Sequence, residues 1–128
     1  MLVTSIPQYI QGLTNAKVDL TTTTATVLYT TPSETDFNTS IVSSILVSED
    51  SGNADTITVT ITNTADAVFS LFKVKAVAAN TTIELLTKDL ILQSGEIIKV
   101  TAATANRLHV VASVQELTKT RISTSAIL

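Results

Sequence analysis

The chain has 128 residues, of which 8 are basic and 11 acidic, and its formal net charge at pH 7 is −3. This length fits one domain, and threonine, valine and isoleucine make up about 38% of it, which is typical of β-sheet proteins. The sequence has three widely spaced glycines, one histidine and no cysteine. It therefore contains no Walker A loop, dinucleotide fingerprint, zinc finger or thiol nucleophile.

The charge pattern also narrows the classes of partner. The positive charges form no cluster denser than the pair Lys73 and Lys75, so we expect no nucleic-acid partner. No run approaches the roughly 18 apolar residues of a membrane span, so we expect no membrane partner. The first ten residues lack a basic region typical of a signal peptide, and the absence of cysteine is typical of a chain assembled in a reducing cytoplasm.

The first half of the chain predicts an arm followed by three strands. Residues 1–24 show no steady period and are interpreted as an N-terminal arm that lies on a neighbour. A short strand over residues 25–30 stops at Pro32, which lacks an N–H group for strand pairing. A strand over residues 40–48 is apolar on both faces, and strict alternation over residues 56–62 predicts a strand with an isoleucine and valine face and a threonine face.

The second half predicts further short strands at spacings of about ten residues. The alternation over residues 68–77 places Phe72, Val74 and Ala76 toward the core, and Phe69 is expected there too. The other strands expected here cover residues 82–87, 90–92, 96–102 and 107–117. Together the elements predict an all-β fold: a single antiparallel β-sandwich or jelly roll of seven or eight strands over residues 25–117, with residues 118–128 as a tail or edge strand.

Candidate chemistry is sparse. His109 is the one residue that could serve as general base for a serine nucleophile, but its position on the outward face of a strand favours a surface histidine. The acidic turn over residues 49–55 has oxygen ligands that calcium prefers, yet it lacks EF-hand spacing and favours a structural turn. We therefore expect no catalytic residue, metal or cofactor.

Partner contacts are expected mainly from the two ends of the chain. Tyr9 is the aromatic residue best placed to fill a pocket on a neighbour, because it lies in the predicted arm. Burial of an arm and a sheet edge adds on the order of 1,000 Å² of contact, enough for a specific complex in a symmetric oligomer. The residues predicted to bind a partner are apolar or aromatic and lie in the arm and the tail: Ile6, Pro7, Tyr9, Ile10, Ile122 and Ile127.

Several segments together resemble a known class of proteins. They are VLYTTP at residues 27–32, ILVSEDSGN at 45–53, TITVTIT at 56–62, LQSGEIIKV at 92–100 and LHVVASVQEL at 108–117. In this order the segments resemble small virion structural proteins of tailed bacteriophages, especially marine and cyanobacterial ones. The resemblance spans about 90 of the 128 residues and carries over no catalytic residue.

The resemblance implies a capsid decoration or cement protein. Such a protein would bind the phage major capsid protein on the exterior of the virion, as a dimer or trimer assembled in the bacterial host cytoplasm. Two alternatives stay open: a neck, tail or fibre-adaptor protein of the virion, and an adhesion module of a bacterial surface. An enzyme would depend on His109 alone.

Overall fold

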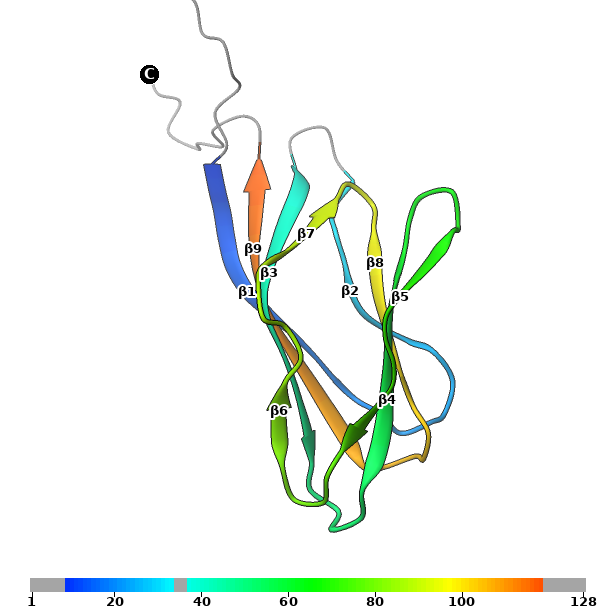
Figure 1. The fold of residues 1–128 in the computed structure, drawn as a ribbon. Coiled ribbons are helices and arrows are strands. Elements are labelled where there is room, and N and C mark those ends of the chain that lie inside the picture. The colour runs from blue at the N-terminus through cyan, green and yellow to red at the C-terminus, as the bar shows by residue number, and fades with distance from the viewer. Residues whose placement is uncertain (1–8, 34–36, 119–128) are drawn as a thin grey trace, which may run out of the picture.

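The computed structural model describes residues 9–33 and 37–118, which form two antiparallel β-sheets packed face to face (Figure 1). We call the two sheets sheet A and sheet B. The described residues contain strands and no helix. Sheet A contains β1 (Tyr9–Asp19), β3 (Phe37–Glu49), β6 (Thr82–Glu84), β7 (Leu90–Gln93) and β9 (Leu108–Thr118). Sheet B contains β2 (Thr26–Thr30), β4 (Asp55–Thr62), β5 (Val68–Val77) and β8 (Ile97–Ala102).

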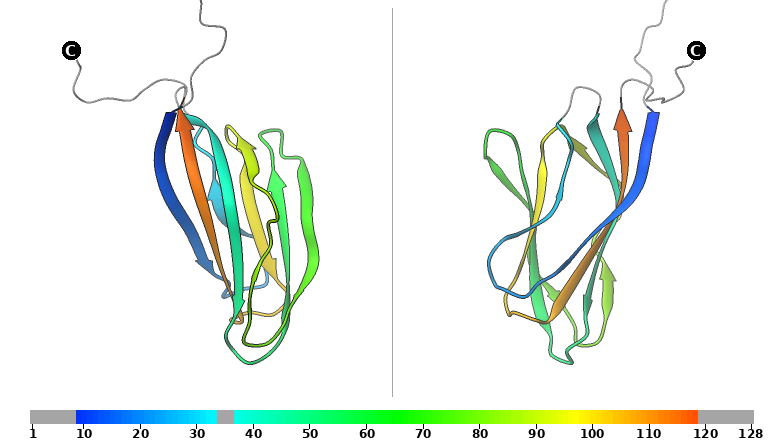
Figure 2. Two further views of the ribbon diagram at one scale, coloured as in Figure 1. Left: turned by 60° about the vertical axis from the view of Figure 1, so that its left-hand side comes forward. Right: turned by 180° about the vertical axis from the view of Figure 1, so that it is seen from behind.

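The order of strands differs from their order in the sequence. In sheet A the order is β1-β9-β3, and the free side of β3 is shared by β6 and β7, which pair with different parts of it. In sheet B the order is β2-β8-β4-β5, so that β2 and β5 form its edges. β1 begins where β9 ends, because Tyr9 pairs with Thr118 (Figure 2). The predicted β-sandwich is confirmed, with nine strands in the described residues rather than seven or eight.

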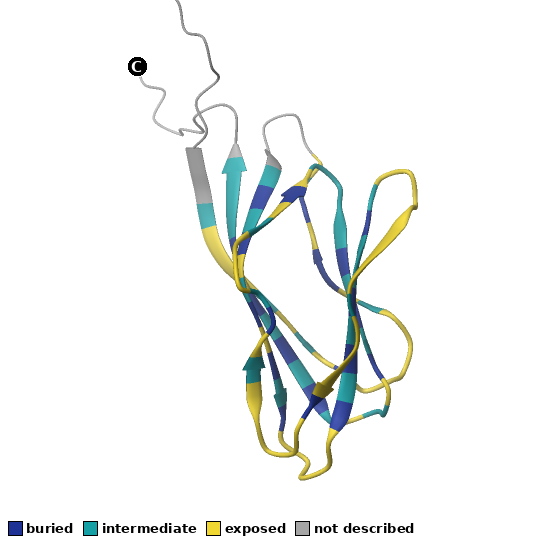
Figure 3. Ribbon diagram, in the orientation of Figure 1, coloured by how far each residue is buried: buried dark blue, intermediate teal, exposed yellow. Residues whose placement is uncertain are grey.

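The core lies between the sheets and follows from the alternation of side chains along the strands. In β9 the predicted inward residues Leu108, Val110, Ala112 and Val114 are all buried. Figure 3 shows buried segments along strands of both sheets. From sheet B the core receives residues such as Ile57, Val59, Ile98 and Val100, which are fully buried. The interior is therefore made mostly of branched aliphatic side chains.

One polar group crosses this interior. Tyr29 of β2 reaches from sheet B to sheet A, where its hydroxyl lies 2.8 Å from the Ser40 hydroxyl and donates to the Glu116 carboxylate at 2.5 Å. Ser40 and Glu116 are cross-strand partners in sheet A. Burial raises the pKa of Tyr29, the Glu116 hydrogen bond and charge raise it further, and Ser40 opposes the shift in part. The phenol therefore stays protonated as the donor.

The structure differs from the sequence prediction at the first strand. Tyr9–Asp19 are not an arm but strand β1, which pairs with β9 along its length and places Ala16 and Val18 against the core. Residues 9–19 mix polar and apolar side chains because only one face of this edge strand packs against the core, while the other face is exposed to solvent.

A second difference concerns β5. The pairs Ile57 with Lys75 and Val59 with Phe72 leave one extra residue in β5, which is a β-bulge. Phe72 packs against the core as predicted, but the bulge moves Val74 outward, to 60% exposure, and gives it a φ of 53°. Phe69 is 54% exposed rather than buried. Ala76 is exposed as well, and Val77 is buried in its place. Alternation predicted Val74 and Ala76 wrongly because it assumes an unbroken strand, whereas the bulge shifts the inward side by one residue.

Candidate functional site

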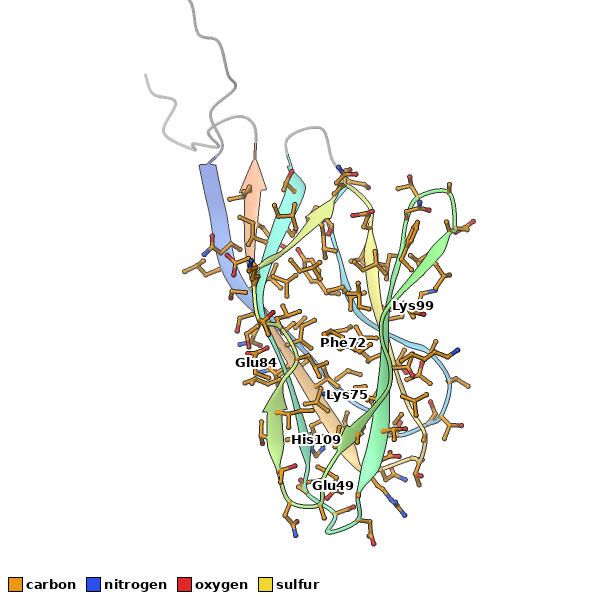
Figure 4. The ribbon with its side chains drawn as sticks, viewed as in Figure 1. Glu49, Phe72, Lys75, Glu84, Lys99 and His109 are labelled. Atoms are coloured by element: carbon orange, nitrogen blue, oxygen red, sulfur yellow. The ribbon has the colours of Figure 1, made fainter. Side chains whose placement is uncertain are left out.

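His109 lies on the outer face of sheet A between two carboxylates. Its Nε2 lies 3.3 Å from Asp19 Oδ1, and its Nδ1 lies 3.5 Å from Asp50 Oδ2. All three side chains are substantially exposed, and Figure 4 shows His109 near one end of the sheets. Both ring nitrogens therefore face carboxylates instead of a serine hydroxyl, an arrangement typical of a surface charge cluster.

The acidic turn after β3 is organised around Glu49. Although its side chain is buried, its carboxylate accepts hydrogen bonds from the backbone N–H groups of Ser51 at 2.8 Å, Gly52 at 3.1 Å and Asn80 at 3.0 Å, and from the Ser51 hydroxyl. Burial by itself would raise the pKa of Glu49, but these bonds lower it from 4.5 to about 2. The carboxylate thus holds together two loops. In the part of the chain described by the structure, no group of three or more His, Cys, Asp or Glu side chains is arranged so that it could hold a metal ion.

The residues predicted to bind a partner are only partly described. Tyr9 and Ile10 lie in β1, where the backbone is described, while Ile6, Pro7, Ile122 and Ile127 lie outside the described residues. Whether these six residues bind a partner stays a prediction. Lys73 and Lys75 of β5 and Lys99 of β8 do not form a joint patch across adjacent strands, because β4 lies between β5 and β8.

Exposed apolar side chains gather on two surfaces. Of the eight large apolar side chains exposed in the described residues, four lie on β5: Val68, Phe69, Leu71 and Val74. β5 is an edge strand, so one side of its backbone is not paired within sheet B (Figure 3). Two bulges, at Leu71 and between Phe72 and Lys75, interrupt its pairing with β4, and Lys73 and Lys75 follow the first of them; bulges and lysines protect edges from further pairing, whereas residues 68–70 pair regularly and carry no charge. The first half of β5 is thus the open part of this edge.

The second surface is the outer face of sheet A, visible obliquely in Figure 2. Ala16, Ala112 and Ile45 point inward, and a bulge at Ser43 lets Val42 point inward as well, so Ile41 and the alternate residues of β1 and β9 point outward. Register arranges these outward residues in rows across the sheet. One row contains Leu13, Gln115, Ile41 and Ile91, and a second contains Lys17, Val111, Leu46 and Glu84.

These rows combine exposure with little charge. Leu13 is 74% and Ile91 is 64% exposed, the two highest values among the large apolar side chains of the described residues. Two shallow hollows lie on this face, one of about 400 Å³ beside Leu13 and Ser113 and one of about 330 Å³ beside Lys17 and Val111. The sequence carries no direct signal for this surface, because the rows depend on the register of several strands.

Comparisons with known proteins give a likeness in fold. No protein-family model matches the sequence, and no curated protein matches it either. A solved structure of Bacillus endospore appendages, described as a family of disulfide-linked pili, has 12% sequence identity and a TM-score of 0.50, and the match covers 92% of this chain and 96% of that one. The present sequence contains no cysteine. None of the described residues forms a helix long and apolar enough to cross a membrane.

Proposed function

We propose that this chain is a non-enzymatic structural protein of a phage virion, a decoration protein that binds the major capsid protein on the outside of the shell as a homo-oligomer. The observation that carries the proposal is the gathering of exposed apolar side chains on β5 and on the outer face of sheet A. Contiguous apolar surface on a soluble domain is typical of sites covered by another protein. The sequence resemblance to virion proteins supplies the identity of that protein.

Within this proposal, the first half of β5 binds the shell. An edge strand with free backbone groups and uncharged side chains can receive a strand or loop of a partner, which adds hydrogen bonds and apolar contacts together. Val68 and Phe69, exposed by 62% and 54%, are the side chains that such a partner would cover.

The experiment is a count of this chain in purified virions of the phage that encodes it, by quantitative mass spectrometry. A ratio near one copy per capsid subunit, or one per few subunits, supports decoration, since the lattice alone offers hundreds of equivalent sites. Six to a few dozen copies would instead support a neck, tail or fibre-adaptor protein with cyclic symmetry. Complete absence from the particle would contradict a virion role.

A matched pair of variants tests the role of β5. Val68→Ser and Val27→Ser make the same change on the two edges of sheet B, at side chains exposed by 62% and 50%. Only Val68→Ser should lower the occupancy of the shell. Equal occupancy for the two variants would contradict docking through β5.

A second candidate is a subunit of a bacterial surface appendage, which the likeness in fold to endospore pili favours. Antibodies against the chain, viewed by electron microscopy, distinguish the two candidates: an appendage subunit would be labelled on fibres of cells and not on phage particles.

A further inference from the structure

We propose that the outer face of sheet A binds the same face of a second copy of this chain, related to it by a two-fold axis that runs parallel to the strands. This inference deepens the function proposed above, because it rests on assembly of the chain with itself and names the surface that carries it. The face is continuous from β1 across β9 to β3 and its partners β6 and β7.

The ends of the two rows lie on opposite edges of the sheet. The first row starts at Leu13 on one edge of the sheet and ends at Ile91 on the other. The second starts at Lys17 and ends at Glu84. Each row therefore has chemically complementary residues at opposite edges: two highly exposed apolar side chains in one, and opposite charges in the other.

A two-fold axis parallel to the strands matches these ends. When two copies face each other across such an axis, each edge of one sheet lies over the opposite edge of the other, and each row faces its own copy. Leu13 then lies over Ile91 of the second copy, and Lys17 over Glu84. Between them, Val111 lies over Leu46. Sheets that pack face to face cross at about 30°, which keeps residues of one row near each other.

The charges of the second row are available for this contact. Lys17 and Glu84 are exposed, and neither forms an ion pair with another described side chain. Glu84 accepts hydrogen bonds from the Ser44 hydroxyl and from the N–H groups of Ile45 at 2.7 Å and Leu86 at 3.1 Å, which hold its carboxylate beside β3. A cation from a second copy would meet a carboxylate that is already positioned.

The size of the face sets the expected strength. Four strand positions spaced about 4.8 Å apart bury on the order of 1,000 Å² in total, which is at the lower end for specific complexes. We therefore expect a dimer with a dissociation constant on the order of micromolar.

A cysteine pair tests the geometry directly, because the native sequence has no cysteine. In one copy Leu13 and Ile91 are three strand positions apart, roughly 14 Å, too far for a disulfide. Oxidation of the double variant Leu13→Cys with Ile91→Cys should give a covalent dimer. The control is Val27→Cys with Val68→Cys, a pair exposed on opposite edges of sheet B, which should stay monomeric under the same dilute conditions.

A charge change tests the second row without cross-linking. Lys17→Glu puts like charges opposite each other and should raise the dissociation constant by about tenfold or more in sedimentation equilibrium. Lys99→Glu, the same change on the outer face of sheet B, should leave it unchanged.

Three results would overturn the two-fold interface: a wild-type chain that is monomeric at concentrations well above micromolar, a trimer, or equal effects of Lys17→Glu and Lys99→Glu. The copy number in virions is a separate measurement. Normal particle occupancy of a Lys17→Glu variant that fails to dimerise would leave the virion role standing while showing that it does not need this dimer.

Discussion

The hydroxyl of Tyr29 donates a hydrogen bond to the carboxylate of Glu116 across the interior of the sandwich, over a distance of 2.5 Å. Tyr29 belongs to β2 of sheet B and Glu116 to β9 of sheet A, so this bond ties the two layers together in addition to their apolar packing. A phenol that stays protonated next to a carboxylate is a charge-assisted donor, which is stronger than a neutral one.

Tyr29→Phe is expected to lower the free energy of unfolding by about 1–3 kcal/mol, because it leaves the half-buried Glu116 carboxylate without this donor. Denaturation by urea measures the change. Glu116→Gln keeps an acceptor for the phenol and should cost less than Tyr29→Phe. A larger loss for Glu116→Gln would show that Glu116 acts through something other than this bond.

The lowered pKa of Glu49 predicts that the free energy of unfolding depends on pH. Its pKa is about 2 in the folded chain and near 4.5 when unfolded, so the ionised carboxylate contributes its full stabilisation above about pH 4.5 and loses it as the pH falls toward 2. The difference in free energy of unfolding between the wild type and Glu49→Gln should therefore shrink over that range. Ser51→Ala removes one hydrogen-bond donor to Glu49, so it should narrow the pH range over which this difference changes. A difference between wild type and Glu49→Gln that is the same at every pH would contradict this account.

Gly95 is expected to resist substitution. Its φ is +77°, and a Cβ atom there would lie 2.8 Å from Thr64 Cγ2. Gly95→Ala should thus lower the free energy of unfolding by about 1–3 kcal/mol, from backbone strain and crowding together. Gly12→Ala is the control, because a Cβ at Gly12 meets nothing within 4 Å, and its thermal unfolding should change little.

Substitutions at the neighbouring residues Ile91 and Leu92 of β7 are expected to affect different properties, namely dimerisation and the stability of the fold. Leu92 is fully buried, so Leu92→Ala should lower the free energy of unfolding by about 2–5 kcal/mol. Ile91 is 64% exposed, so Ile91→Ala should change it by less than about 1 kcal/mol when measured at concentrations where the chain is monomeric. Ile91→Ala should instead weaken the dimer, which sedimentation can measure.

The positive φ of Val74 predicts that a substitution at this position can stabilise the fold. It is a β-branched residue with a φ of 53°, a conformation that asparagine adopts at lower cost, and its side chain is mostly exposed. Val74→Asn should raise the free energy of unfolding by about 1 kcal/mol. Val68→Asn, the same change at an exposed position of the strand without a positive φ, should give no gain in the same thermal melts.

The fold class could be predicted from the sequence where alternation was regular. The threonine face of residues 56–62 and the inward series from Leu108 to Val114 both depend on local pattern alone, and the structure confirms them. β1 was missed because its few inward residues, Ala16 and Val18, stand among polar ones. β1 is held in place by backbone hydrogen bonds to β9, and backbone hydrogen bonds do not require particular side chains in β1.

The candidate surfaces could not be predicted in the same way. The bulge in β5 that turns Val74 outward depends on pairing with β4, and the rows on sheet A depend on register across several strands. Leu13 and Ile91 are 78 positions apart in the sequence. Their relation becomes visible only when the strands between them are placed.

The position of β9 in sheet A has a consequence for synthesis of the chain. β9 follows every other described strand in the sequence but lies between β1 and β3, which pair with it and not with each other. On the ribosome, sheet B can be completed once β8 has emerged, whereas β1 and β3 have no common partner until residues 108–118 are outside the exit tunnel. Before that point, nascent chains on the same messenger RNA lack a complete outer face of sheet A through which to pair. The order of the strands thus delays self-assembly until the whole sandwich has been translated.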